Sequence, residues 1–170
     1  MARRFARRRD GHVDATFERG ELDLLEGLPE QLRTLYGTDD EDPARTRLFP
    51  RAYLDPTEEQ AEAEWQALVH PGLMEARLDA LTTLETTIAA AEPTRRDRLV
   101  VRLSAEQANA WLGVLNDARL ALGSRLGITD DTELATLDPS DPNAPTLAAY
   151  GWLTYLEGEL VETLLGDLPG

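Results

Sequence analysis

Apolar residues recur along most of this chain with the spacing of amphipathic helices. Residues 18–36 carry the first such stripe, formed by Leu22, Leu25, Leu28, Leu32 and Leu35. Pro29 interrupts the stripe without shifting its phase, so we expect a kink or two abutting helices there. Gly37 supplies a helix stop.

A second helical region is expected after a capping signal. Thr57 and Gln60 match a capping box, which predicts a helix to about residue 69. His70-Pro71-Gly72 should break or kink it, and a further helix should cover 73–91. An arginine stands within the apolar stripe of this helix, which consists of Leu73, Arg77, Leu81, Leu84 and Ile88.

The most apolar helix should cover about 105–126. Ser104 and Gln107 form a second capping box, and Gly127 followed by Ile128 fits a Schellman-type end. One narrow face contains a charge among apolar residues: Ala108, Leu112, Leu115, Arg119, Leu122 and Leu126. A last helix is expected at 146–165, with the stripe Ala149, Leu153, Leu156, Leu160 and Leu164.

Two long acidic, proline-containing loops should separate these helices, at residues 38–56 and 129–145. In the first loop we expect Leu48, Phe49 and Tyr53 to pack onto the helices; a partner-binding loop is the alternative. The second loop lacks the spacing and the glycine of a calcium loop and indicates a solvated linker.

Two segments alternate apolar and polar residues as half-buried strands do, at 12–17 and 98–103. Unpaired backbone groups are costly when buried, so these strands should pair with each other. We therefore predict a mainly α fold with a minor β part: about five helices and a small two-stranded sheet. The 170 residues fit a single domain spanning 1–170.

Composition excludes several chemistries. The chain has no cysteine, which excludes disulfides, thiolate catalysis and cysteine zinc sites. All 17 basic residues are arginine, so Schiff-base chemistry and a P-loop lysine are also excluded. The N-terminus resembles no secretory signal, and no apolar run is long enough to span a membrane. We expect a cytoplasmic protein that does not contact a membrane.

The charge is unevenly distributed. The net charge is −15, but residues 1–9 carry five arginines and no acid, so this segment contributes +5 and the rest −20. The acidic body argues against non-specific binding of nucleic acid. The first nine residues should form a basic arm, either solvated or touching a phosphate backbone or an acidic partner through Arg3, Arg4, Arg7, Arg8 and Arg9.

No catalytic, cofactor or metal site is predicted. His12 and His70 are the only histidines, and neither has the neighbouring spacing of a zinc site. Gly123-Ser124-Arg125-Leu126-Gly127 lies at a helix end, whereas a hydrolase nucleophile requires a strand before the serine. We therefore expect a protein that is not an enzyme and has no cofactor.

Arg119 is the most informative single residue, because a charge on an apolar face is costly unless paired. We expect a structural ion pair with a carboxylate such as Glu157 or Glu159; a pocket or an oligomer interface is the alternative. Asn116 and Asp117 lie off this face and could orient neighbouring chain ends. The candidate structural or interaction residues of this helix are Arg119, Asn116, Asp117, Trp111 and Arg125.

Four segments carry a resemblance to a known family: 22–35, 42–53, 111–128 and 150–156. The run Trp111-Leu112…Leu115-Asn116-Asp117 with Arg119-Leu120 and Arg125-Leu126-Gly127 is its most specific part. In order along the whole chain, these segments resemble an actinobacterial family. Most members are of unknown function, and the family includes the AosR-type oxidative-stress transcriptional regulators.

The resemblance implies a regulatory protein that acts with transcription machinery such as a sigma factor. It also implies a cysteine pair near the N-terminus as redox switch, which this cysteine-free chain lacks. The leading hypothesis is a non-enzymatic protein-interaction module. The alternatives are a DNA-binding regulator using the basic arm, and a ligand-binding protein with a pocket near Arg119. A homodimer through the apolar helices is a further expectation.

Overall fold

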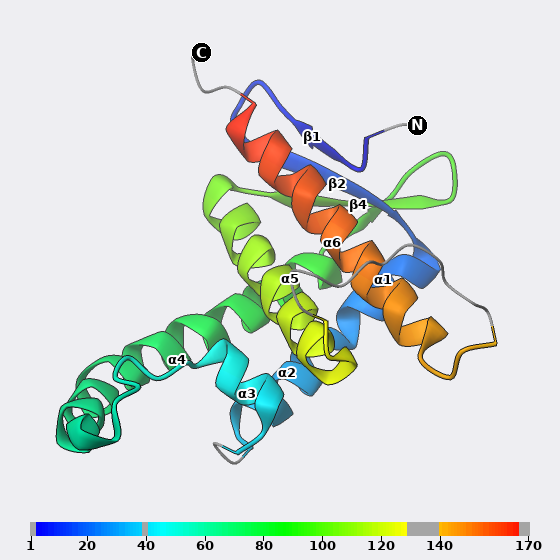
Figure 1. Ribbon diagram of the computed structural model, residues 1–170. Coiled ribbons are helices and arrows are strands. Elements are labelled where there is room, and N and C mark those ends of the chain that lie inside the picture. The colour runs from blue at the N-terminus through cyan, green and yellow to red at the C-terminus, as the bar shows by residue number, and fades with distance from the viewer. Residues whose placement is uncertain (1–2, 39–40, 129–139, 167–170) are drawn as a thin grey trace.

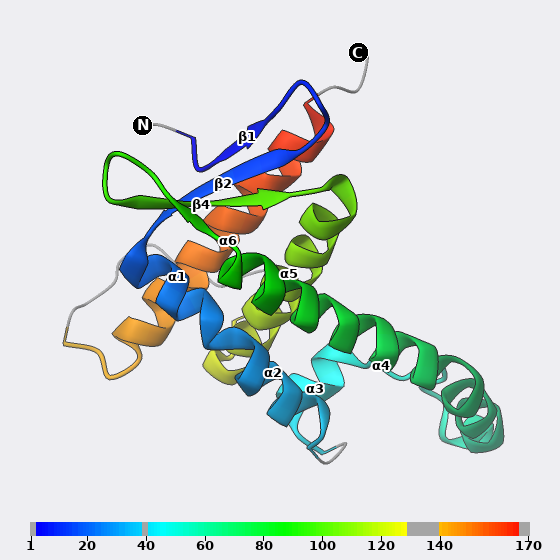
Figure 2. The ribbon, with the colours of Figure 1, turned by 180° about the vertical axis from the view of Figure 1, so that it is seen from behind.

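The computed structural model describes residues 3–38, 41–128 and 140–166. These residues form a mainly helical fold with a small antiparallel sheet (Figures 1 and 2). In chain order the elements are β1 (Phe5–Arg7), β2 (Val13–Glu18), α1 (Arg19–Glu26), α2 (Leu28–Tyr36), α3 (Pro43–Leu48), the 3-10 turn η1 (Pro56–Glu58), α4 (Glu59–Ala89), β3 (Glu92–Pro93), β4 (Arg98–Leu103), α5 (Ala105–Leu126) and α6 (Ala144–Leu165).

The sheet has four strands in the order β1-β2-β4-β3, all antiparallel. The expected pairing of the two longer strands is confirmed, with Val13 opposite Leu103 and Phe17 opposite Leu99. The prediction of only two strands is wrong. Short β1 adds at one edge because Phe5, an apolar residue inside the basic segment, is buried in the core.

One face of the sheet is covered by helices and the other is open (Figures 1 and 2). Phe17 occupies the centre of the covered face, with the rings of Phe5 and Trp111 each 6.0 Å away. Trp111, one of the candidate structural or interaction residues, is fully buried, and its Nε1 donates a 2.8 Å hydrogen bond to Thr87 Oγ1 on α4. This bond satisfies the one polar group that the indole brings into the core.

Two helix boundaries follow the sequence signals closely. Ser104 Oγ accepts from the Gln107 backbone, the Gln107 side chain accepts from Ser104, and α5 begins there as predicted. Gly127 ends α5 in the left-handed conformation, with φ of 69°. Pro29 lies in the first turn of α2, where a backbone N–H would have no hydrogen-bond partner within the helix. The proline is therefore tolerated there, and α1 and α2 are the expected abutting helices.

Helix α4 differs from the prediction. The expectation of two separate helices is wrong, because one helix of 31 residues contains Pro71 in its interior. The helix axis nevertheless turns toward its N-terminal end, which agrees with the kink that was the other expectation (Figures 1 and 2). Both Pro71 and Gly72 are exposed. Water can therefore hydrate the carbonyl that the proline leaves without a helical donor, which lets the helix continue.

Of the first predicted loop, residues 41–56 contain a helix and the start of a 3-10 turn, and residues 39–40 lie outside the described residues. Asp42 caps the short helix α3 through the backbone N–H of Ala44, and Leu48 is buried. Phe49 packs on the ring of Tyr36, 5.6 Å away, as expected, whereas Tyr53 is 37% exposed.

Thr57 is not the N-cap of α4. Asp55 caps the 3-10 turn that precedes α4, and it accepts from the Thr57 backbone. Of the second predicted loop, residues 129–139 lie outside the described residues, and α6 begins at Ala144. No helix within the described ranges is long and apolar enough to cross a membrane.

Candidate interaction groove

The expected ion pair of Arg119 is present. Its Nε lies 2.7 Å from Glu157 Oε2, and its Nη2 donates a 3.1 Å hydrogen bond to Asn116 Oδ1. Both charged side chains are largely shielded from solvent. The pair therefore ties α5 to α6 and explains how a charge is tolerated on the apolar face.

The alternative expectation was a pocket near Arg119. Two pockets of about 890 Å³ each flank α5, and neither of them includes that residue. One lies between α4 and α5 and includes polar groups of both helices. The other, between α1–α2, α5 and α6, is mostly apolar.

A buried polar cluster lies at the pocket between α4 and α5, and the sequence analysis did not predict it. Asp117 accepts a 2.6 Å hydrogen bond from the Tyr36 hydroxyl and a short charge-assisted bond from Arg77 Nη1. Arg77 also donates to the carbonyl of Leu48 at 3.0 Å. The cluster joins α2, α3, α4 and α5, and the position of Arg77 within an apolar stripe was the available signal for it.

The electrostatics of this cluster suit a structural role. Burial, followed by the charge of Asp117, raises the pKa of Tyr36 well above its usual value, so the phenol stays protonated. Burial opposes the charge of Arg77, but its hydrogen bond with Asp117 outweighs this and raises the arginine pKa. Neither Tyr36 nor Arg77 therefore changes its protonation state near neutral pH.

The basic N-terminal segment is bound to the body rather than free. Arg4 forms an ion pair with Glu21 at 2.5 Å, and its backbone N–H donates to Glu159 at 2.7 Å. Arg8 lies 2.9 Å from Asp14. The expected arm is therefore largely the edge strand β1 and its turn.

The two histidines remain apart. His12 lies 3.3 Å from Asp10 in the β1–β2 turn. His70, on α4, packs against the ring of Phe49, which follows α3. No group of three or more potential metal ligands occurs among residues 3–38, 41–128 and 140–166.

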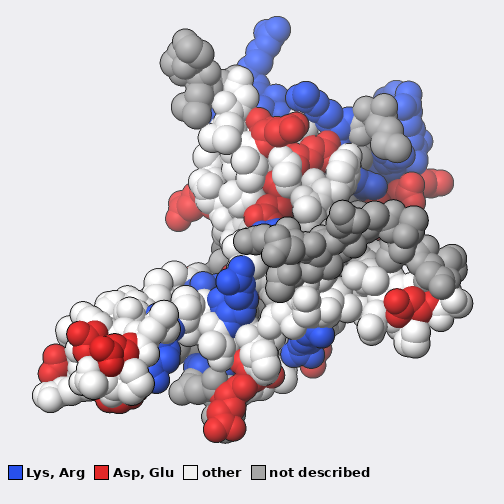
Figure 3. Space-filling view, in the orientation of Figure 1, with Lys and Arg blue, Asp and Glu red and all other residues white. Residues whose placement is uncertain are grey.

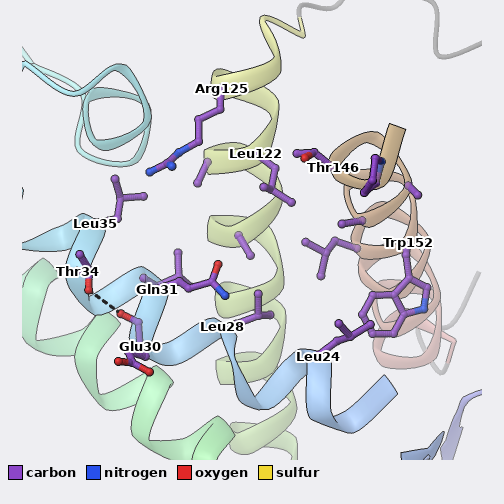
Figure 4. Close-up of a pocket in the computed structure, with 17 residues that line it drawn as sticks. Leu24, Leu28, Glu30, Gln31, Thr34, Leu35, Leu122, Arg125, Thr146 and Trp152 are labelled. Atoms are coloured by element: carbon purple, nitrogen blue, oxygen red, sulfur yellow. Dashed lines mark hydrogen bonds between the residues drawn. The ribbon is translucent and has the colours of Figure 1, made fainter. Parts of the chain in front are cut away.

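The apolar pocket is an open groove at the C-terminal end of α5 (Figure 4). Its residues come from three walls: Leu24, Leu28, Glu30, Gln31, Leu32, Thr34 and Leu35 on α1–α2; Ala118, Ala121, Leu122 and Arg125 on α5; and Pro145, Thr146, Ala148, Ala149, Trp152 and Leu153 on α6. Leu24 is 65% exposed. A large apolar side chain left in solvent beside such a groove is typical of a binding surface.

Small residues create the space for the groove. Ala118 and Ala121 on α5 and Ala149 on α6 line it, so the two helices leave a gap where larger side chains would fill it. These α5 positions lie on the side of the helix away from Arg119. One side of α5 therefore secures α6, and another forms the floor of the groove.

The polar groups of the groove are few. Arg125 is exposed and extends over one end, while Trp152 lies at the other (Figure 4). Arg125 has no ion-pair partner among the described residues, unlike Arg119. The groove thus offers apolar contact together with one cation, Arg125, and one carboxylate, Glu30. An apolar segment that carries a carboxylate at the Arg125 end would suit it.

Relatives of this chain have been named as regulators. It is 31% identical over 165 residues to the oxidative stress regulator AosR of Mycobacterium tuberculosis, strain H37Rv, and to the protein of that name in Mycobacterium bovis, covering 91% of this chain and 71% of each relative. It is 33% identical over 136 residues to a putative oxidative stress regulator AosR of Mycobacterium leprae, covering 74% and 59%.

No solved structure matches the chain. A family model described as a domain of unknown function, DUF2017, matches residues 2–164, which is nearly the whole sequence. The chain therefore belongs to the DUF2017 family.

Proposed function

We propose that this chain is a non-enzymatic regulatory protein of the cytoplasm that acts by binding another protein in the groove between α1–α2, α5 and α6. The observation that carries the proposal is the groove itself, an open and mostly apolar surface whose one lining cation, Arg125, has no ion pair among the described residues. Monomeric proteins rarely expose large apolar surfaces, and such surfaces usually mark a protein-interaction site.

The names of the relatives support the regulatory part of the proposal. Transcription machinery such as a sigma factor is the partner class that the AosR-type resemblance suggests. Because the chain contains no cysteine, the signal it answers is not a disulfide within this protein. Candidate partners therefore bind according to their own state or abundance.

Complementation of cells that lack the protein tests this proposal. Leu24→Glu places a charge in the groove at a site 65% exposed, so folding is retained; Leu165→Glu is the matched control at 54% exposure outside it. We expect oxidant-induced transcripts to return with the wild type and the control but not with the groove variant. Equal rescue by all three forms would refute a regulatory role for the groove.

Photo-crosslinking identifies the partner in the same cells. A crosslinking amino acid at Thr34, exposed in the groove, should capture polymerase or sigma components. The same residue at exposed Thr154, outside the groove, is the control. Identical capture profiles at the two positions would count against the groove as the binding site.

Direct DNA binding is a second candidate, favoured by the segregation of charge. The sheet and its turns, residues 1–18 and 92–104, contain nine arginines and five acids, leaving +4; the remaining residues contain eight arginines and 27 acids, leaving −19. Blue side chains gather at this end in Figure 3. Duplex binding that weakens steeply with salt would support this candidate, and salt-independent binding would exclude it.

A further inference from the structure

The N-terminal half of α4 projects from the body of the protein together with the segment before it (Figures 1 and 3). We call residues 49–72 the arm. The first buried apolar side chain of α4 is Leu81. Leu68 lies 13 positions before it, about 20 Å farther out along the helix at 1.5 Å per residue.

Internal contacts hold one side of the arm together. The buried carboxylate of Glu62 accepts hydrogen bonds from the backbone N–H groups of Ala52 and Tyr53, at 3.1 and 2.9 Å. Farther along the same side of α4, His70 packs on the ring of Phe49 at 5.2 Å. The arm is therefore a formed hairpin of an extended segment and a helix.

The other side of the arm carries an apolar stripe that is exposed at Leu68 and Gly72 and half-buried at Ala61 and Trp65. Ala61, Trp65, Leu68 and Gly72 follow each other at helical spacing, away from Glu62 and His70. Leu68 is 83% exposed. Glu64, one turn before Leu68, adds an exposed carboxylate at the edge of this stripe.

We propose that two copies of the chain exchange arms, so that the apolar stripe of each arm fills the groove of the other copy and Glu64 faces Arg125. The inference rests on the proposed function in treating the groove as a docking site. The arm cannot reach the groove of its own copy, because α4 carries it away from the body to the far end of the molecule (Figure 1).

Charge and size favour this pairing over contact between two arms. The arm contains five acids and only Arg51, which is paired with Glu59 at 2.6 Å, so two arms side by side would repel. The groove supplies one cation, Arg125, which has no ion pair in the described chain, and one carboxylate, Glu30, so it is far less acidic than a second arm. Its α2 edge, from Leu28 to Leu35, spans about two helical turns, as does the stripe from Trp65 to Gly72.

Arm exchange also regulates the proposed function. A partner protein that binds the groove must displace the arm of the second copy, so dimerisation and partner binding exclude each other. The fraction of free grooves then rises as the protein becomes more dilute.

Sedimentation equilibrium of the purified chain tests the exchange. We expect a dimer, and a dissociation constant raised at least about tenfold by Leu68→Glu in the arm or by Leu24→Glu in the groove. Leu165→Glu, outside both surfaces, should leave it unchanged. Arg125→Glu should weaken the dimer, and adding Glu64→Arg to the same chain should restore it.

Mixing the variants separates arm exchange from other dimers. A Leu68→Glu chain keeps its groove and a Leu24→Glu chain keeps its arm, so the mixture regains one of the two contacts and should form heterodimers. A monomer at every concentration, a dimer that neither variant weakens, or a mixture that stays apart would overturn the proposal. Because complementation by Leu24→Glu is measured separately, a monomeric protein would leave the proposed function standing.

Discussion

Arg77 on α4 donates a charge-assisted hydrogen bond to Asp117 on α5, and the carboxylate is 8% exposed. Removing one partner of a buried pair leaves the other charge uncompensated. Asp117→Ala should therefore lower the free energy of unfolding by about 3 kcal/mol, measured by urea denaturation. Asp79 is exposed and lines the pocket between α4 and α5, so Asp79→Ala should lower the free energy of unfolding by less than about 0.5 kcal/mol.

Replacing both partners distinguishes a buried pair from simple packing. Arg77→Met with Asp117→Leu should recover much of the loss, because no buried charge remains unpaired. If Asp117→Ala cost no more than Asp79→Ala, the cluster would contribute nothing to stability.

The Arg119–Glu157 pair makes a weaker, testable link between α5 and α6. Its side chains are 26% and 20% exposed, so solvent screens part of the attraction. In a double-mutant cycle with Arg119→Met and Glu157→Gln, we expect a coupling energy of about 1 kcal/mol. The exposed Arg51–Glu59 pair is the comparison and should couple by less than about 0.5 kcal/mol. Equal coupling in the two cycles would contradict the structural importance of Arg119.

Local signals predicted the elements whose determinants are local. Ser104 and Gly127 bound α5 because capping bonds join residues three or four apart, and the β2–β4 register follows the alternation of Val13, Ala15 and Phe17. The ion pair of Arg119 was also predictable, since an apolar face requires a partner for a charge.

Features that depend on distant segments escaped prediction. Asp117 meets partners 40 and 81 positions away, so no spacing along α5 indicates its burial. β1 has three residues and forms only because Phe5 finds a core. The groove arises from the packing of three separate helices, and Pro71 is tolerated because that turn of α4 is exposed.

Acid should weaken the attachment of β1 through Glu21. Burial acts to raise the pKa of Glu21, but hydrogen bonds from Arg4 and the Glu18 backbone outweigh it and lower the pKa below its ordinary 4.5. A carboxyl group whose pKa is lower in the folded than in the unfolded state stabilises the protein at a pH above its unfolded-state pKa. This stabilisation is lost as the pH falls through the folded-state pKa. Unfolding free energies of the wild type and Glu21→Gln should therefore differ at pH 7 and converge below about pH 4.

The comparison for that experiment is Glu26→Gln, because Glu26 is exposed and has no described ion pair. Its unfolding free energy should run parallel to that of the wild type across the same pH range. A difference between wild type and Glu21→Gln that stays constant from pH 7 to pH 3 would mean that Arg4 does not bind the ionised carboxylate.

The two ends of α5 should contribute separately to stability. Ser104→Ala removes the side-chain acceptor for the Gln107 backbone and should cost about 1 kcal/mol of unfolding free energy. Gly127→Ala places a Cβ at φ of 69°, where nothing within 4 Å crowds it, so backbone strain alone should cost about 1 kcal/mol. Because the sites lie at opposite ends of a 22-residue helix, the double variant should lose the sum of the two free energies.

Gly113→Ala, also uncrowded but inside α5, is the matched control and should stabilise the protein, since alanine favours a helix. Urea denaturation measures all four variants, and a Gly127→Ala protein as stable as Gly113→Ala would contradict the left-handed end of α5.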